Sequence, residues 1–142
     1  MNSGFKEFDG NLMLGINKNW GHSYFNVSSY NTTLNIVEGE RDADGQFTFI
    51  NNNGDDVTAT DEDYKGYKVG FPHQEINHLR LTSNNYFLLN NGTINADFAF
   101  QNNKRKEFAD STNPDEKELF FDLNTFNYNV RYNLKETNNW ET

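Results

Sequence analysis

The sequence predicts an all-β protein: an antiparallel up-and-down meander of five to six long strands that forms part of a transmembrane β-barrel wall. Three observations lead to this class. Aromatic residues make up 15% of the chain while hydrophobic residues make up only 35%, and aromatics together with many asparagines favour strands joined by turns. The candidate strands run to about 10 to 15 residues, whereas strands of globular proteins average nearer 5 or 6. The connections alternate between short and long, as the periplasmic turns and outer loops of outer-membrane barrels do.

The composition and charge argue against several other classes of protein. The 142 residues suffice for one domain, and the chain contains no cysteine for a disulfide framework. A formal net charge of −9 argues against nucleic-acid binding, which needs a basic surface. No run of about 18 apolar residues predicts a membrane-spanning helix. The first ten residues, MNSGFKEFDG, lack the basic and apolar regions of a signal peptide.

Two strands are predicted before residue 35. In the segment from Phe8 to Ile16 the even positions are apolar or glycine, which is the alternation of a pleated strand with one apolar side. A short break at residues 18–21 follows. The segment from Ser23 to Leu34 does not separate its two faces cleanly, and its tyrosine, valine and threonine content is what favours a strand there.

The region from residue 35 to residue 73 is predicted to be a long outer loop with a small hairpin at residues 46–50. Long ordered loops are usually functional. The loop contains Asp42-Ala43-Asp44-Gly45, whose carboxylates suggest calcium. The spacing lacks the third acidic ligand and the closing glutamate of an EF-hand, so an ordinary turn is expected. The acidic residues 61–63 are also expected to lie in the loop.

The stretch from Gln74 to Lys106 is predicted to be a hairpin. Its two arms are separated by Asn90-Asn91-Gly92, and an Asn-Gly pair supplies the positive φ angles of a tight turn. The second arm carries four apolar residues on one face: Ile94, Ala96, Phe98 and Phe100. A second loop is predicted over residues 108–116.

The last predicted strand runs from about Leu119 to Leu134 and alternates most clearly. One face carries large apolar residues, namely Phe126, Tyr128, Val130, Tyr132 and Leu134. The other face carries polar residues, namely Asn127, Asn129, Arg131 and Asn133. Such a strand suits lipid on one side and water on the other.

Four segments carry a resemblance to a known family: GNLMLGINKNWGHSYFNVSSYN (10–31), IVEGERDADGQFTF (36–49), GFPHQEINHLRLTSNNYFLLNNGTINADFAFQNNKRKEF (70–108) and LFFDLNTFNYNVRY (119–132). They resemble the barrel of TonB-dependent outer-membrane receptors of Bacteroidetes-type bacteria. The resemblance covers nearly the whole chain and rests on strand and loop segments, without a catalytic signature.

This resemblance implies a location in the Gram-negative outer membrane, in contact with outer-membrane lipid. It implies a barrel of about 22 strands filled by a plug domain, with uptake of a ferric siderophore, cobalamin or similar nutrient. It also implies the TonB complex as the partner that supplies energy. The sequence holds about five strands and no plug, so a single partial barrel segment over residues 1–142 is expected.

Candidate site residues fall into two groups. A small-molecule ligand is expected to contact residues where the long loop re-enters the barrel: Asp61, Asp63, Tyr64, Tyr67 and Phe71. A hydrophobic cluster that only orders the loop accounts for these residues equally well. Lumen-facing positions are predicted at Asn95, Asp97, Asn127, Asn129 and Arg131.

No catalytic residue, cofactor or metal site is predicted, and the chain is not expected to be an enzyme. His73, Glu75 and His78 fit a barrel lining or a loop better than a metal site. Two other classes remain open: a soluble β-barrel or sandwich that binds a ligand or carbohydrate on exposed tyrosine and tryptophan, and a surface adhesion or structural β module. The lipid-facing hypothesis predicts an exposed apolar band of Phe98, Phe100, Tyr128, Val130 and Tyr132, whereas a soluble fold would bury it.

Overall fold

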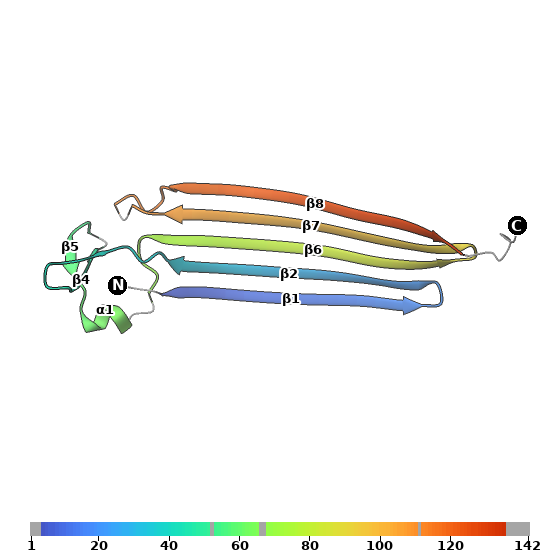
Figure 1. The fold of residues 1–142 in the computed structure, drawn as a ribbon, viewed down its shortest axis with the longest axis horizontal. Coiled ribbons are helices and arrows are strands. Elements are labelled where there is room, and N and C mark those ends of the chain that lie inside the picture. The colour runs from blue at the N-terminus through green and yellow to red at the C-terminus, as the bar shows by residue number, and fades with distance from the viewer. Residues whose placement is uncertain (1–3, 52, 66–67, 111, 136–142) are drawn as a thin grey trace, which may run out of the picture. The chain divides into compact units, whose positions relative to one another are not determined.

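The computed structural model describes residues 4–51, 53–65, 68–110 and 112–135. Five long strands form one sheet in the order β1-β2-β6-β7-β8, lying side by side in chain order (Figure 1). Their bounds are Phe5–Lys18 (β1), Gly21–Asn35 (β2), His73–Leu89 (β6), Gly92–Phe108 (β7) and Leu119–Leu134 (β8). The predicted all-β antiparallel meander is therefore confirmed. Among the described strands the sheet is open, with β1 and β8 at its edges.

The strands are long, as the sequence predicts, but at 14 to 17 residues three of them exceed the predicted 10 to 15. The predicted last strand, Leu119 to Leu134, is confirmed at both ends. The first strand extends three residues before Phe8 and two residues beyond Ile16. The predicted alternation of connections is also confirmed, because the tight turns at residues 19–20 and 90–91 alternate with the connections at residues 36–72 and 109–118.

The turn between β6 and β7 forms without the positive φ angles predicted for it. Within the described residues, positive φ occurs only at Gly21, Gly45 and Gly54. Gly92 is instead the first residue of β7, where a Cβ atom would collide with the carbonyl oxygen of Asn133. The backbone N–H of Lys135 donates to the Asn91 carbonyl at 2.9 Å beside it. Glycine at this position therefore permits close approach of the end of β8.

The long connection contains a second sheet of three short strands: β3 (Glu40–Arg41), β4 (Phe47–Ile50) and β5 (Asp56–Thr58). β4 is the central strand and pairs antiparallel with both neighbours, with Arg41 opposite Phe47 and Phe49 opposite Val57. The hairpin predicted around residues 46–50 is therefore part of a slightly larger unit. One short helix, α1 (Asp61–Lys65), follows. No helix in the described part of the chain is long and apolar enough to cross a membrane.

The described residues divide into two compact units. The loop unit comprises those within 1–9, 30–78 and 103–123 and contains both long connections. The turn unit comprises those within 10–29, 79–102 and 124–142 and contains both tight turns. Each unit is described separately below.

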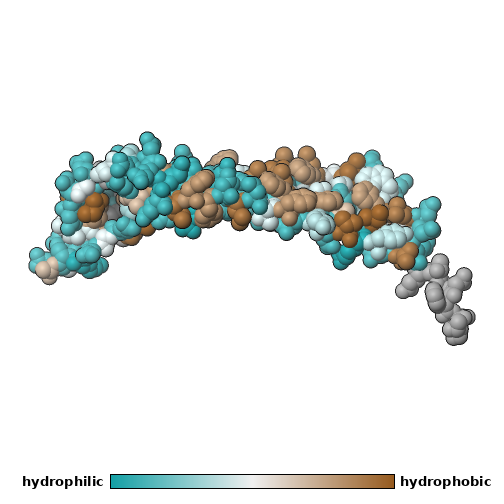
Figure 2. Space-filling model, turned by 90° about the horizontal axis from the view of Figure 1, so that it is seen from above, coloured by the Kyte–Doolittle hydropathy of each residue, from teal (hydrophilic) through white to brown (hydrophobic). Residues whose placement is uncertain are grey.

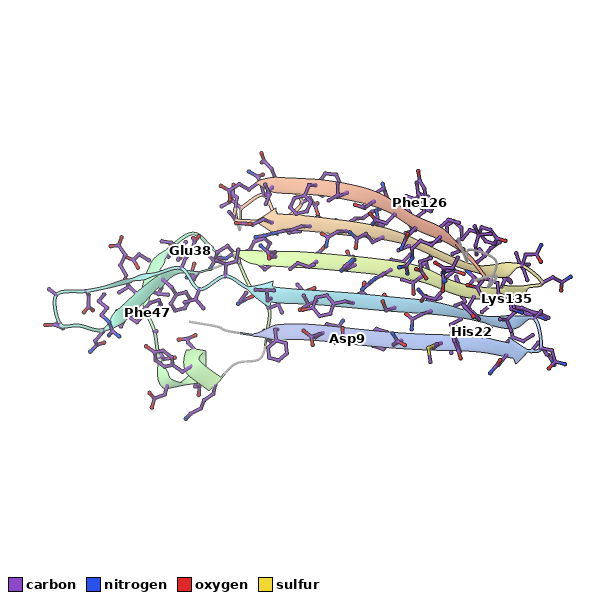
Figure 3. The ribbon with its side chains drawn as sticks, turned by 45° about the vertical axis from the view of Figure 1, so that its right-hand side comes forward. Asp9, His22, Glu38, Phe47, Phe126 and Lys135 are labelled. Carbon is purple, nitrogen blue, oxygen red and sulfur yellow. The ribbon has the colours of Figure 1, made fainter. Side chains whose placement is uncertain are left out.

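Side-chain contacts define a polar face of the sheet in the turn unit. Asn26 donates to Asn11 across β1 and β2 at 3.0 Å, and Asn84 donates to Asp97 across β6 and β7 at 2.9 Å. The ring of His22 (Figure 3) contacts the rings of Tyr24 and Tyr86, with centroids 5.3 and 5.2 Å apart. The predicted lumen-facing residues of β7, Asn95 and Asp97, lie on this face, because alternate residues of a strand share a side.

The residues between these polar positions form an apolar face on the opposite side of the turn unit. It carries Leu12, Leu14, Ile16, Phe25, Val27, Leu79, Leu81, Phe98, Phe100, Phe126, Tyr128, Val130, Tyr132 and Leu134. Among the described residues, the only buried hydrophobic ones are Ala96 and Phe108. Phe98, Tyr128, Val130 and Tyr132 of the predicted apolar band are exposed, and Phe100 is half-buried. Brown hydrophobic side chains accordingly appear on the surface along the strands (Figure 2), and Phe126 projects from β8 (Figure 3).

Candidate functional site

Two turns with the same hydrogen-bonding pattern connect the strands of the small sheet in the loop unit. In the first, between β3 and β4, the N–H of Asp42 donates to the Gln46 carbonyl at 2.9 Å and the N–H of Gly45 donates to the Asp42 carbonyl at 3.0 Å. The Asp42 carboxylate also accepts the N–H groups of Asp44 and Gln46, at 3.0 and 2.8 Å. Gly45 has a φ of 77°, as the last residue of a three-residue hairpin loop requires. The structure therefore has a turn at the predicted position, ordered by the Asp42 carboxylate.

The second turn, between β4 and β5, repeats these hydrogen bonds. The N–H of Asn51 donates to the Asp55 carbonyl and the N–H of Gly54 donates to the Asn51 carbonyl, both at 2.9 Å. The side-chain oxygen of Asn51 accepts the N–H groups of Asn53 and Asp55 at 2.8 and 3.0 Å. Gly54 has a φ of 86°. An Asp or Asn followed three residues later by glycine is the shared sequence signal.

The helix α1 was not predicted; residues 61–63, which were expected in the long loop, lie there and form the start of this helix. Thr60 precedes the helix, and the Asp63 carboxylate accepts both its backbone N–H at 2.7 Å and its hydroxyl at 2.6 Å. This is a capping arrangement in which the third helical residue satisfies the N-cap. The Thr60 hydroxyl, and then its N–H, lower the pKa of Asp63 below its ordinary value. The Thr-x-x-Asp pattern was the available sequence signal.

The long connection and the second loop line a cavity in the loop unit, with a volume of about 1580 Å³. The ends of the connection are held together where Ile36 N–H donates to the Pro72 carbonyl at 2.9 Å and Gly70 N–H donates to the Asn35 side chain at 2.7 Å. Six carboxylate residues line the cavity: Glu38 (labelled in Figure 3), Glu40, Asp56, Glu62, Asp63 and Asp110. Two amines, those of Lys65 and Lys68, line it as well, and the apolar wall includes Phe49, Val57 and Phe71.

The predicted ligand-binding residues lie only partly at this cavity. Asp63 and Phe71 line it, whereas Asp61 and Tyr64 do not, and the Tyr64 side chain is exposed. Tyr67 lies outside the described residues. The other lining carboxylates were not predicted as site residues. They come from four separate segments, and no spacing pattern in the sequence indicates that these segments line one cavity.

The predicted lumen residues of β8 all lie in the turn unit. Asn127, Asn129 and Arg131 are exposed and alternate with the apolar residues of the same strand. The side chain of Asn133, two positions beyond Arg131, donates to the Thr93 hydroxyl at 3.4 Å. Thr93 lies two positions before Asn95, so these residues of β7 and β8 share the polar face.

His73 and His78 both belong to the loop unit. The His73 ring stacks on Phe108 with centroids 4.8 Å apart and contacts Phe71 edge-on at 4.9 Å. His73 Nδ1 and His78 Nε2 are buried without a hydrogen-bond partner. Within the residues that the structure describes, no group of three or more His, Asp or Glu side chains is arranged to hold a metal ion.

Ion pairs join the strands in the loop unit. Lys106 pairs with Glu75 across β7 and β6 at 3.0 Å, and Lys104 pairs with Asp122 across β7 and β8 at 3.1 Å. The side chains are about one-third exposed, so each pair contributes at most about 1 kcal/mol. Arg105 and Glu107, which alternate with these lysines on β7, pair with each other along the strand at 3.7 Å.

Comparisons of the chain with known protein families, with characterised proteins and with solved structures gave no match.

Proposed function

We propose that this chain forms part of the wall of an outer-membrane β-barrel receptor of the TonB-dependent type, which takes up a ferric siderophore, cobalamin or similar nutrient. The uncovered apolar face of the turn unit carries the proposal. Water-soluble monomers rarely expose contiguous apolar patches larger than a few hundred Å². Lipid is the solvent that makes such a face favourable, at about 25 cal/mol for each Å² of apolar surface removed from water.

The dimensions of the apolar face support this assignment. On β8 the alternation runs from Phe126 to Leu134, which matches the 9 to 11 residues that a tilted strand needs to cross a bilayer. Tyr128 is 72% exposed and Leu134 is 76% exposed, although both are large apolar side chains. The polar positions between them suit a water-filled interior.

Three polar side chains on the apolar face, those of Ser23, Ser83 and Asn85, form hydrogen bonds with one another, which suits contact with lipid. The Asn85 side-chain oxygen accepts from the Ser23 hydroxyl. Its amide donates to the Ser83 hydroxyl and to the Ala96 carbonyl, both at 3.0 Å. Polar groups in a bilayer cost free energy unless they are paired in this way.

In the proposed mechanism the loop unit captures the ligand and the polar face of the turn unit lines its route. That route passes Asn95, Asp97, Asn127, Asn129 and Arg131, beside a plug domain that the TonB complex moves. Further strands pair with β1 and β8, from the rest of the receptor or, when the chain is produced alone, from other copies of it, because unpaired strand edges are not tolerated in lipid. The plug and these strands are supplied from outside the 142 residues.

A soluble β module that binds a ligand or carbohydrate is the second candidate. The aromatic side chains of His22, Tyr24 and Tyr86 on the polar face favour it, since Tyr24 is exposed and could stack on a sugar ring. This candidate requires something other than lipid to cover the apolar face.

Production of the full chain with and without detergent separates the two candidates. The receptor proposal predicts aggregation in plain buffer and a folded, β-rich state in detergent micelles or lipid vesicles. Circular dichroism and sedimentation would measure both. A monodisperse monomer that unfolds cooperatively in plain buffer would contradict the proposal and favour the soluble module.

A further inference from the structure

We propose that the loop-unit cavity binds an organic cation with an apolar body. The cavity supplies the binding site, and the charge of its lining selects the ligand. This inference rests on the proposed function only for its physiological purpose, because the cavity lies wholly within the loop unit. If the inference is correct, the ligand of the proposed receptor is a cation and not an anionic metal chelate.

The charge of the lining is one-sided. Six residues with carboxylate side chains and two lysines line the cavity, which leaves four negative charges in excess. In the part of the chain that the structure describes, none of the six carboxylates belongs to an ion pair. Clefts lined by one sign of charge concentrate ligands of the opposite sign and repel ligands of the same sign.

Two carboxylates that line the cavity, those of Asp63 and Asp110, accept hydrogen bonds that favour their charged forms. Asp63 accepts two hydrogen bonds from Thr60, and Asp110 accepts the Thr112 hydroxyl at 2.6 Å and its N–H at 2.7 Å. These hydrogen bonds lower the pKa of both groups. Hydrogen bonding within the loop unit therefore favours negative charge at two positions of the lining.

The apolar part of the wall explains why an organic cation fits better than a small hydrated ion. Phe49 and Val57 are opposite one another in the small sheet, and Phe71 lines the same cavity. Phenylalanine rings attract organic cations through their negative faces. Ligand pockets of about 300 to 1,000 Å³ hold drug-sized molecules, so this cavity accommodates a ligand of that size.

Two dyes of opposite charge built on one xanthene ring system test the inference. The full chain, in whichever medium it folds, is titrated with cationic rhodamine 123 and with anionic fluorescein while fluorescence anisotropy is recorded. We expect saturable binding of rhodamine 123 and no saturable binding of fluorescein. Equal or tighter binding of fluorescein, or no saturable binding of either dye, would overturn the inference.

A matched pair of triple variants locates the binding site. Glu38→Gln, Glu40→Gln and Glu62→Gln together remove three exposed carboxylates of the lining and are expected to weaken rhodamine 123 binding about tenfold. Asp115→Asn, Glu116→Gln and Glu118→Gln change the net charge equally, outside the cavity lining, and are expected to weaken it less than about twofold. Equal weakening by both triples would overturn the cavity assignment.

This test and the detergent test can fail separately. If the chain is a monomer in plain buffer, the receptor proposal fails while the titration still decides the ligand class. If the chain folds only in lipid and rhodamine 123 does not bind, the receptor proposal stands and the cavity inference fails.

Discussion

Single residues decide how closely neighbouring strands approach one another in this sheet. Gly21 has a φ of 131°, and a Cβ atom there would collide with the carbonyl oxygen of Tyr86. Beside it, the N–H of Leu88 donates to the Trp20 carbonyl at 2.7 Å. Any side chain at Gly21 must therefore push β2 and β6 apart where their pairing begins.

Gly21→Ala is predicted to destabilise the fold by about 1 to 3 kcal/mol, from backbone strain and the displaced carbonyl. Urea unfolding of the full chain in its folding medium measures the loss. Gly10→Ala is the control, since nothing lies within 4 Å of a Cβ atom at that position. Gly10→Ala is expected to leave stability unchanged or to raise it slightly. Equal losses in the two variants would contradict this account of Gly21.

The capping of helix α1 makes a prediction about pH. The pKa of Asp63 is lowered by Thr60, so the carboxylate stabilises the folded state fully above the ordinary aspartate value of 3.8. This contribution is lost as the pH falls below 3.8 and through the folded-state pKa. In Thr60→Val the hydroxyl donor is gone, and the pKa of Asp63 is expected to rise towards 3.8 in a carbon-13 NMR titration. An unchanged pKa of Asp63 would contradict the capping assignment, whereas Asp110 should be unaffected.

At the scale of the element, the repeated turns explain why the long connection is ordered. In each turn one side-chain oxygen accepts two backbone N–H groups, from Asp44 and Gln46 in the first and from Asn53 and Asp55 in the second. These N–H groups therefore need no carbonyl group of the short strands as a hydrogen-bond acceptor. Three strands of 2 to 4 residues can therefore pair.

Asp42→Ala is predicted to speed hydrogen exchange of the Gln46 amide by about fivefold to tenfold, the effect of losing one net hydrogen bond. Exchange measured by NMR at a fixed pH tests it. Asp44→Ala is the control, because the backbone of Asp44, and not its carboxylate, takes part in the turn. A similar acceleration in both variants would indicate that the loss of a negative charge, and not the loss of the hydrogen bond to Asp42, speeds the exchange.

The long strands could be predicted from the sequence because period-two alternation is a local property of each strand. The bounds of β8 follow from its residues alone. The helix and the small sheet were harder to predict, because they depend on side-chain-to-backbone hydrogen bonds such as those between Asp63 and Thr60. The cavity could not be predicted, because Glu38, Asp56 and Asp110 are far apart in the sequence and line the same cavity only in the folded connections.

The alternation within β8 also predicts how the strand tolerates charge. Val130 lies at the middle of the apolar stretch from residue 126 to residue 134, and Val130→Arg is expected to destabilise the lipid-inserted state by about 2 to 4 kcal/mol. Asn129→Arg, one residue away on the polar face, is expected to cost less than about 1 kcal/mol. Unfolding from lipid vesicles in urea measures both. Equal tolerance of the two arginines would contradict a lipid-facing side.

At the scale of the whole molecule, the sheet of the turn unit has two chemically different faces, and the described residues form almost no buried core. Ala96 and Phe108 are the only buried hydrophobic residues among those described. Packing within the chain therefore supplies little of the usual hydrophobic stabilisation, and the apolar face must be covered from outside. A bilayer would cover that face in the turn unit, while strands pairing with β1 and β8 would satisfy the sheet edges.

Depth-dependent fluorescence quenching tests this central claim most directly. Two single-tryptophan proteins, Tyr128→Trp and Asn129→Trp, are built in a chain that also carries Trp20→Phe and Trp140→Phe, and are folded into vesicles of lipids brominated along their acyl chains. Bromine quenches only tryptophans that touch the acyl chains. The account predicts strong quenching of the tryptophan at position 128 and little quenching at position 129. Equal quenching at both positions, or none at either, would contradict it.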